Sequence, residues 1–89
     1  MTTYQHLLWA DRIKDTNLFL ADMQDLSKYH WAEWTKWNDE FIAMCHRSLE
    51  VARTDGRQDD AEKLENSIEH AEAIGERLFA SGVAKGYHR

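Results

Sequence analysis

Five glutamates near the C-terminus are the residues whose spacing is most suggestive of chemistry. They recur at intervals of three and four residues: Glu62, Glu65, Glu69, Glu72 and Glu76. On an α-helix this acidic row falls within an arc of about 80° and extends about 21 Å along the axis. Neighbouring carboxylates at these spacings repel one another by roughly 0.2–0.5 kcal/mol per pair. Because no lysine is interleaved to relieve the repulsion, we expect a compensating partner, inside the fold or outside it.

The acidic row has an internal and an external explanation. If the preceding helix is antiparallel, His46, Arg47 and Arg53 come to lie opposite the 62–69 region and can pair with two or three carboxylates. In the external explanation, the row docks into a basic groove of a partner protein. Its charges are spaced roughly like those of a nucleic-acid backbone, so the row suits a site built for phosphates, where lysine and arginine dominate the affinity.

The histidines and the single cysteine raise the question of a metal site. His46 and His70 are expected on facing helices, but Cys45 and His46 are sequence neighbours that point about 100° apart on a helix. A metal site needs three or four convergent ligands. Neither a Cys-x-x-Cys pair nor the Glu-x-x-His motif of di-iron bundles occurs. We therefore expect no metal and no cofactor, and Cys45 is expected to be a small buried residue.

Motifs for catalysis are missing from the sequence. There is no Gly-x-Ser-x-Gly nucleophile motif and no glycine-rich phosphate loop. A small helical bundle whose core is filled by aromatic side chains also leaves little room for a substrate pocket. The sequence therefore favours a binding protein without catalytic residues over an enzyme.

Length and composition predict a single globular domain. The 89 residues are 43% hydrophobic and include four tryptophans, which argues against disorder. Proline is absent and glycine occurs four times, so long helices are expected. One cysteine excludes an internal disulfide and suits a reducing compartment. With no signal-peptide pattern and no apolar run near 18–20 residues, a cytoplasmic protein that does not contact membranes is expected.

The net charge of −5 is distributed unevenly. Residues 1–58 carry −2, residues 59–76 carry −6 and residues 77–89 carry +3. An acidic chain is a poor direct ligand for nucleic acid. A helix-turn-helix is also disfavoured, because the clearest glycine turn leads into the most acidic segment. The charge instead favours a protein partner with a basic surface.

Hydrophobic periodicity near 3.6 predicts an all-α fold of three helices. The expected ranges are 3–26, 28–53 and 59–81, followed by a short loose tail at 83–89. Short connections imply a compact three-helix bundle in an up-down-up arrangement. The polar residues 15–17 offer an alternative in which the first helix is divided, and the continuous helix is the form we expect.

Helix ends are indicated by particular residues. Ser27 is a candidate N-cap for the second helix. Gly56 can adopt the left-handed conformation that ends it. Asp59 or Asp60 is expected to cap the third helix, where an acid suits the helix dipole. Gly82 and Gly86 are expected to end that helix.

The second helix carries a wide apolar arc that contains three tryptophans. The arc covers about 180°, more than a single partner helix requires. We expect Trp37 and Phe41 in the core, and at least two of Trp31, Trp34 and Trp37 largely buried. Trp31, at the edge of the arc, is expected to remain exposed as an interface anchor, since tryptophan is enriched at binding hot spots. Trp9 is expected to meet this cluster.

These observations predict a small acidic regulator or inhibitor that binds a protein. Its acidic helix would dock on a basic surface of a larger assembly, such as one that handles nucleic acid. Small acidic proteins of this kind are common among virus-encoded inhibitors. The expected partner-binding residues are Trp31, Glu62, Glu65, Glu69, Glu72 and Glu76. The alternative is a structural or assembly protein that forms a homo-oligomer, such as a homodimer, through the Trp-rich helix.

Overall fold

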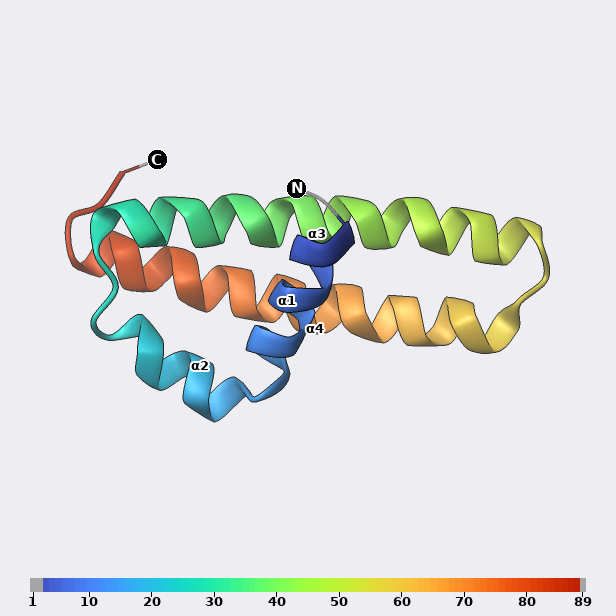
Figure 1. Cartoon of the computed structure of the whole chain (residues 1–89), viewed down its shortest axis with the longest axis horizontal. Coiled ribbons are helices and arrows are strands. Elements are labelled where there is room, and N and C mark those ends of the chain that lie inside the picture. The colour runs from blue at the N-terminus through green and yellow to red at the C-terminus, as the bar shows by residue number, and fades with distance from the viewer. Residues whose placement is uncertain (1–2, 89) are drawn as a thin grey trace.

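In the described part of the chain, four α-helices in two layers make up the fold. The computed structural model describes residues 3–88, and no strand occurs in that range, so the predicted all-α class is confirmed. The helices are α1 (Thr3–Lys14), α2 (Thr16–Met23), α3 (Lys28–Thr54) and α4 (Gln58–Ala84). The two long helices α3 and α4 form an antiparallel hairpin (Figure 1). In the second layer, α1 crosses the hairpin near its middle, and α2 lies along the half remote from the turn.

The first predicted helix is divided at Asp15. The backbone of Asp15 is extended, and its carboxylate accepts a hydrogen bond of 3.2 Å from the backbone N–H of Leu18. Asp15 therefore caps α2. The continuous helix, and with it the count of three helices, was wrong, and the alternative of a division at 15–17 is confirmed. The break lets α1 and α2 take different directions while Trp9 and Phe19 still meet edge-to-face, with ring centroids 5.5 Å apart.

Both ends of α3 follow the sequence prediction. The Ser27 hydroxyl accepts a hydrogen bond of 3.2 Å from the backbone N–H of His30, so Ser27 is the N-cap. Gly56 has φ of +74°, and the next N–H, of Arg57, donates to the Ala52 carbonyl at 2.9 Å. This Schellman motif satisfies a carbonyl that the end of the helix leaves without a partner.

The start of α4 differs from the prediction. The helix begins at Gln58, with Arg57 in the cap position and no side-chain capping bond. Asp59 and Asp60 lie inside the first turn, so neither is the N-cap. The Schellman motif brings the chain directly into α4, which begins one residue earlier than the expected start at 59. Both acids still favour the helix, because the first turn is the positive end of the dipole.

The C-terminal end of α4 also lies beyond its predicted place. The helix continues through Gly82 to Ala84 and ends at a second Schellman motif, in which Gly86 has φ of +83°. The N–H of Tyr87 donates to the Gly82 carbonyl at 2.8 Å. The prediction that Gly86 ends the helix is therefore confirmed, whereas Gly82 lies inside the helix.

Over residues 83–88 the predicted loose tail was wrong, because the side chains of Lys85 and Tyr87 hold this segment against the end of α2 and the loop that follows it. Arg89 lies outside the described residues. The Tyr87 hydroxyl donates to the Leu26 carbonyl at 2.9 Å, and Lys85 Nζ donates to the Met23 carbonyl at 2.9 Å. The Tyr87 ring also lies 5.8 Å from that of Trp31. The tail thus adds hydrogen bonds to the carbonyl of the last residue of α2, Met23, and to that of Leu26 in the loop that follows.

Trp31 is part of the core and not of an interface. It is 1% exposed, and its Nε1–H donates to the Leu78 carbonyl at 2.7 Å. Its indole lies against the backbone of α4 at Gly82, where any Cβ would overlap the ring. The prediction of an exposed Trp31 was wrong. It was based on the position of Trp31 at the edge of the apolar arc of its own helix, whereas the room for the ring is provided by a glycine 51 residues away in the sequence.

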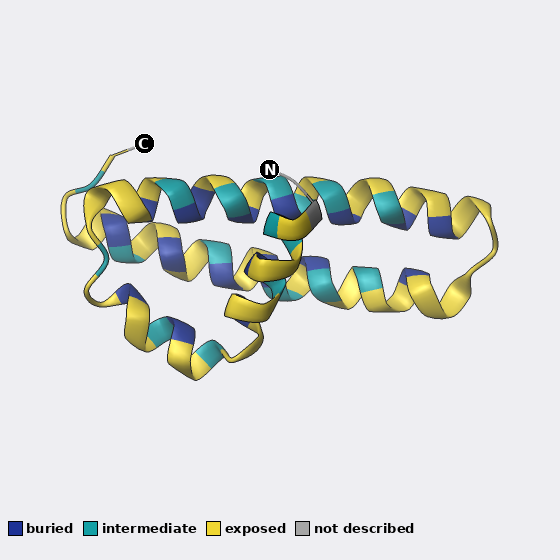
Figure 2. Ribbon diagram, in the orientation of Figure 1, coloured by how far each residue is buried: buried dark blue, intermediate teal, exposed yellow. Residues whose placement is uncertain are grey.

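The rest of the aromatic core agrees better with the sequence. Trp34 and Phe41 are buried and Trp37 is partly buried. The buried positions of α3 and α4 lie mainly where the two helices face each other (Figure 2). At least two tryptophans of α3 are thus buried, as predicted. Trp37 was expected in the core, and it packs against the core but is only partly buried. Trp9 packs edge-to-face on Trp34 and Trp37, with centroids 5.9 and 6.2 Å apart, so the expected contact is confirmed.

Two polar side chains tie α1 to the hairpin. Asn38 is 1% exposed; its Oδ1 accepts from Trp9 Nε1–H at 3.0 Å, and its Nδ2–H donates to the Ala71 carbonyl at 2.9 Å. His70 Nε2 lies 2.8 Å from the Ile13 carbonyl. Because a carbonyl only accepts, that ring nitrogen carries a hydrogen. These bonds fix where α1 crosses α3 and α4.

Candidate functional site

The acidic row lies on the face of the hairpin that α1 and α2 leave uncovered. All five of its glutamates are exposed. The second layer contacts α4 on another side, since Ser81, which donates to the Met23 carbonyl of α2, lies about 140° around the helix from Glu76. The sequence therefore placed the row correctly on the surface of the last helix.

One internal ion pair compensates the row. Arg53 on α3 donates to Glu65, and both side chains are more than half exposed. Pairs this exposed contribute at most about 1 kcal/mol. Within residues 3–88, Arg47 and His46 form no ion pair with the row, and Glu65 is its one paired member. The internal explanation holds for a single carboxylate, so most of the row's charge has no partner in the described structure.

A shallow groove runs beside the row between α3 and α4. It has a volume of about 390 Å³. We call it the acidic groove, and its lining residues are Thr35, Asn38, Asp39, Ile42, Glu72, Gly75, Glu76 and Phe79. The two glutamates stand on the α4 rim with Asp39 on the α3 rim. Gly75 leaves room for the buried amide of Asn38, because a Cβ there would lie 2.6 Å from Asn38 Nδ2.

The acidic groove adds an apolar contact to the carboxylates. Phe79 is 47% exposed and Ile42 is partly buried. An arginine or lysine side chain entering here would meet charge-assisted hydrogen bonds at the rim and an aromatic ring at the end of the groove. Sequence reasoning missed both apolar residues. The available signal was Phe79, which follows Glu76 by three residues and lies outside the apolar seam of the last helix.

The histidine and cysteine residues do not converge. Cys45 is buried as predicted, and desolvation by burial raises the pKa of its thiol, which keeps it protonated and unreactive. His46 is exposed, and His70 is bonded to α1. In the described part of the chain, no group of three or more His, Cys, Asp or Glu side chains is arranged to hold a metal ion.

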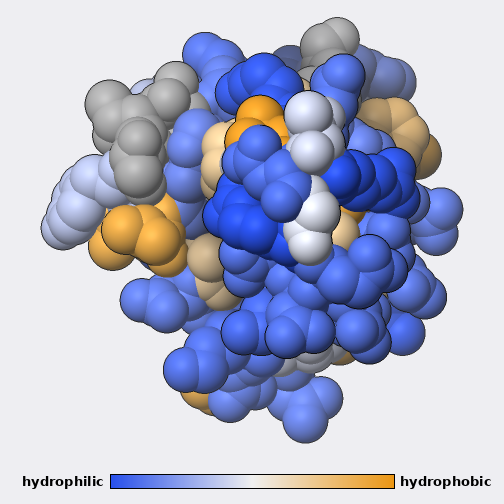
Figure 3. All heavy atoms as spheres, turned by 90° about the vertical axis from the view of Figure 1, so that its right-hand side faces the viewer, coloured by the Kyte–Doolittle hydropathy of each residue, from blue (hydrophilic) through white to orange (hydrophobic). Residues whose placement is uncertain are grey.

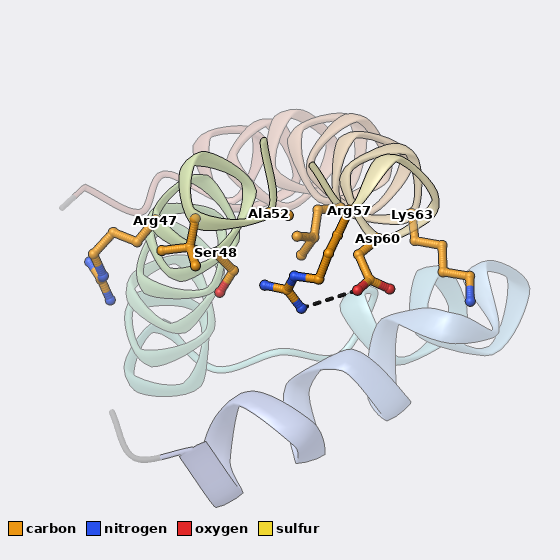
Figure 4. Close-up of a pocket in the computed structure, with 8 residues that line it drawn as sticks. Arg47, Ser48, Ala52, Arg57, Asp60 and Lys63 are labelled. Carbon is orange, nitrogen blue, oxygen red and sulfur yellow. Dashed lines mark hydrogen bonds and ion pairs between the residues drawn. The ribbon is translucent and has the colours of Figure 1, made fainter. Parts of the chain in front are cut away.

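A second groove lies on the opposite face of the hairpin, near its turn. It has a volume of about 540 Å³. We call it the basic groove, and it is lined by Arg47, Ser48, Val51, Ala52, Arg57, Asp60, Lys63 and Leu64. The labelled side chains of Arg47, Arg57 and Lys63 extend toward the side on which α1 lies (Figure 4). Viewed onto the turn, hydrophilic residues cover most of the surface and leave separate apolar areas between them (Figure 3).

The bases around this groove are only partly neutralised. Arg57 pairs with Asp60 at 3.1 Å and with Asp55 at 3.8 Å. Arg47 and Lys63 form no ion pair with any residue from 3 to 88. The two faces of the hairpin therefore carry opposite charge, with carboxylates on the uncovered face and bases near the turn on the face that carries α1.

Comparison with known proteins adds no assignment. The chain matches no protein-family model, and no curated protein and no solved structure is significantly similar to it. None of the helices from residue 3 to residue 88 has the length and apolar character needed to cross a lipid bilayer. The function must therefore be argued from the two charged surfaces.

Proposed function

We propose that this protein is a small regulator or inhibitor that binds a protein partner through the acidic row and the acidic groove. The partner presents a basic surface within a larger assembly, such as one that handles nucleic acid, in the cytoplasm. The observation that carries the proposal is that four carboxylates of the row are exposed and form no ion pair within residues 3–88. They are Glu62, Glu69, Glu72 and Glu76.

Electrostatics favours a basic protein over other partners. Lysines and arginines on the partner would relieve the repulsion along the row and form charge-assisted hydrogen bonds with it. Their charge would also accelerate association at low salt. Nucleic acid would be repelled by the same carboxylates, so the proposed contact is with the protein component of the assembly. Exposed carboxylates are sufficient for a role in binding, so the proposed function includes no catalytic step.

Phe79 takes the role that the sequence had given to Trp31. A half-exposed aromatic ring beside charged groups is a typical binding anchor. It lies at the end of the acidic groove, so a partner that pairs with Glu72 and Glu76 would also cover it. A specific partner is thus expected to combine basic residues with an apolar side chain.

Assembly through the Trp-rich helix is the weaker candidate. Trp31 and Trp34 are buried inside the monomer, and Trp37 is partly covered. The surface that this alternative requires is therefore mostly used by α1, α2 and α4.

The central test removes charge from the row while keeping its shape. The variant E69Q/E72Q/E76Q retains side-chain length and helix propensity. We expect it to be as stable as the parent or slightly more stable, because repulsion is reduced. A partner captured by the parent chain should bind the variant at least about 100-fold more weakly, which corresponds to about 2.8 kcal/mol. Calorimetric titration of the purified partner measures this.

A charge-matched control separates the row from net charge. The variant D22N/D25N/E50Q neutralises the same number of exposed carboxylates elsewhere and should bind normally. Parent affinity should also fall steeply with added salt. Equal affinity of the parent and the row variant would contradict the proposal. So would a row variant whose melting temperature falls by several degrees, since that result would assign the carboxylates to the fold.

A further inference from the structure

The basic groove lies where the second layer of helices is missing. α1 and α2 cover the hairpin from its middle to the end remote from the turn, and no other helix of residues 3–88 lies beside α1 on the turn side (Figure 1). Val51, 53% exposed, and Leu64, partly buried, are apolar side chains of the groove, and Arg47 and Lys63 flank them. A pair of antiparallel helices with an open apolar groove offers a place for a third helix.

The groove is at the right distance to hold a helix beside α1. α1 meets α4 at His70, which bonds to the Ile13 carbonyl. Leu64 and Lys63 lie six and seven residues toward the turn, which is about 9–10 Å along the helix axis. Helices that pack side by side are separated by about 8–10 Å. A helix seated in the basic groove would therefore also contact α1.

α1 is apolar on two opposite sides. Trp9 and Ile13 face the hairpin and are buried. Tyr4, Leu7 and Leu8 are 69%, 64% and 49% exposed. Together with Asp11 they form an outer stripe within an arc of about 100°. A helix that is apolar on both sides is typical of one buried between two layers, and the monomer provides only one of them.

We propose that two copies of this chain form a two-fold dimer in which the outer stripe of each α1 sits in the basic groove of the other copy. A two-fold axis parallel to α1 places the two α1 helices side by side in one middle layer. Each then contacts its own hairpin through Trp9 and Ile13 and the other hairpin through Tyr4, Leu7 and Leu8. The exchange is reciprocal, so the assembly closes at two copies.

Charge and apolar surface favour a second copy as the occupant. Asp11 on the outer stripe has no ion pair within residues 3–88, and neither have Arg47 and Lys63 in the groove. Eight large hydrophobic side chains are exposed in the described chain. Four of them lie on α1 or in the groove close to it: Tyr4, Leu7, Leu8 and Val51. The dimer buries these, and the turn end of each copy extends over α2 of the other, where Leu18 is 66% exposed.

The dimer leaves the acidic row free on both copies, so it is independent of the proposed function. The row and the acidic groove lie on the face of the hairpin turned away from α1. Loss of the dimer should not by itself remove those carboxylates, and loss of partner binding should not change the dimer. The two proposals can therefore fail separately.

The test is sedimentation velocity of the full chain across a concentration series. The parent should pass from the 10.5 kDa monomer to a species of twice that mass as concentration rises. An outer-stripe variant, L7K/D11K, and a groove variant, R47E/K63E, should each raise the dissociation constant by at least about 100-fold. All four positions are exposed, so circular dichroism should show an unchanged fold. V83K, on the far face, is the control and should dimerise like the parent.

Mixing the two variants provides the decisive measurement. In a 1:1 mixture, the new lysines of one chain meet the new glutamates of the other, and the second contact pairs the unaltered stripe with the unaltered groove. The dimer mass should return in the mixture alone. A parent that stays monomeric up to about 1 mM overturns the proposal. A dimer that survives both variants, or a mixture that stays monomeric, overturns it as well.

Discussion

Gly82→Ala is expected to lower the free energy of unfolding by about 2–4 kcal/mol, through overpacking and loss of a buried hydrogen bond. A Cβ at this position would overlap the indole of Trp31. The ring has no free direction in which to retreat. Its Nε1–H is bonded to the Leu78 carbonyl at 2.7 Å, and its ring lies 5.9 Å from Phe79 and 5.8 Å from Tyr87.

Urea unfolding followed by circular dichroism measures this loss. Alanine is the better helix former by about 1 kcal/mol, so the clash must exceed that gain. The control is a double-mutant cycle with Trp31→Leu, in which the smaller side chain leaves room for the added methyl group. In that background Gly82→Ala should be neutral or stabilising. A stability equal to the parent's for Gly82→Ala alone would show that Trp31 does not lie against α4 as described.

Asn38→Asp is expected to cost about 3–5 kcal/mol at pH 7, because it places an unpaired carboxylate in the core. The Nδ2–H of Asn38 donates to the Ala71 carbonyl. In the variant, a negatively charged carboxylate oxygen would replace this donor and would face the Ala71 carbonyl oxygen, which repels it. Burial and this repulsion raise the pKa of the new carboxyl above its unfolded value. A raised pKa means that the folded state binds the proton more tightly. The deficit should therefore be smallest below about pH 4 and grow as pH rises.

Asn38→Leu is the matched control for pH dependence. It also breaks the bonds to Trp9 and Ala71 but introduces no titratable group. Its stability deficit relative to the parent should change little between pH 4 and pH 7. Denaturant unfolding of both variants at a series of pH values makes the comparison. A deficit for Asn38→Asp that does not depend on pH would contradict the buried position of this side chain.

The hairpin could be predicted because its signals are local. The apolar periodicities of α3 and α4 run for many turns, and Ser27 and Gly56 have a side chain or a backbone freedom that suits a helix end. The division of the first helix was harder. Its apolar stripe continues in register through Asp15, so periodicity favoured one helix, whereas the capping bond to Leu18 depends on where α1 and α2 pack.

Errors at the core came from contacts between distant residues. The burial of Trp31 depends on Gly82, and the ordered tail depends on carbonyls at the end of α2 that Lys85 and Tyr87 reach. Neither contact has a signal within one helix. Helical-wheel reasoning assigns a residue at the edge of an arc to solvent, and only the tertiary arrangement shows which neighbour covers it.

The candidate site likewise has one part that could be predicted from the sequence and parts that could not. The acidic row was readable because one helix carries all of it. The acidic groove was not, because Asp39 and Ile42 come from α3 and meet Glu72 and Phe79 only through the antiparallel register. The basic groove was hidden for a further reason: it exists where a second layer stops, and the sequence had predicted one continuous first helix over 3–26 in a compact three-helix bundle.

The uneven cover of the hairpin has a kinetic consequence. α3 and α4 have 27 residues each, but the second layer supports only the half remote from Gly56. At concentrations at which the chain is monomeric, amide hydrogens in 47–54 and 58–64 should exchange with solvent through local unzipping from the turn, several orders of magnitude faster than those in 31–41 and 71–82, which need global unfolding. Hydrogen exchange followed by mass spectrometry would show this gradient. Each of the two long helices is continuous, but its half near the turn and its half remote from the turn would then belong to two different cooperative units.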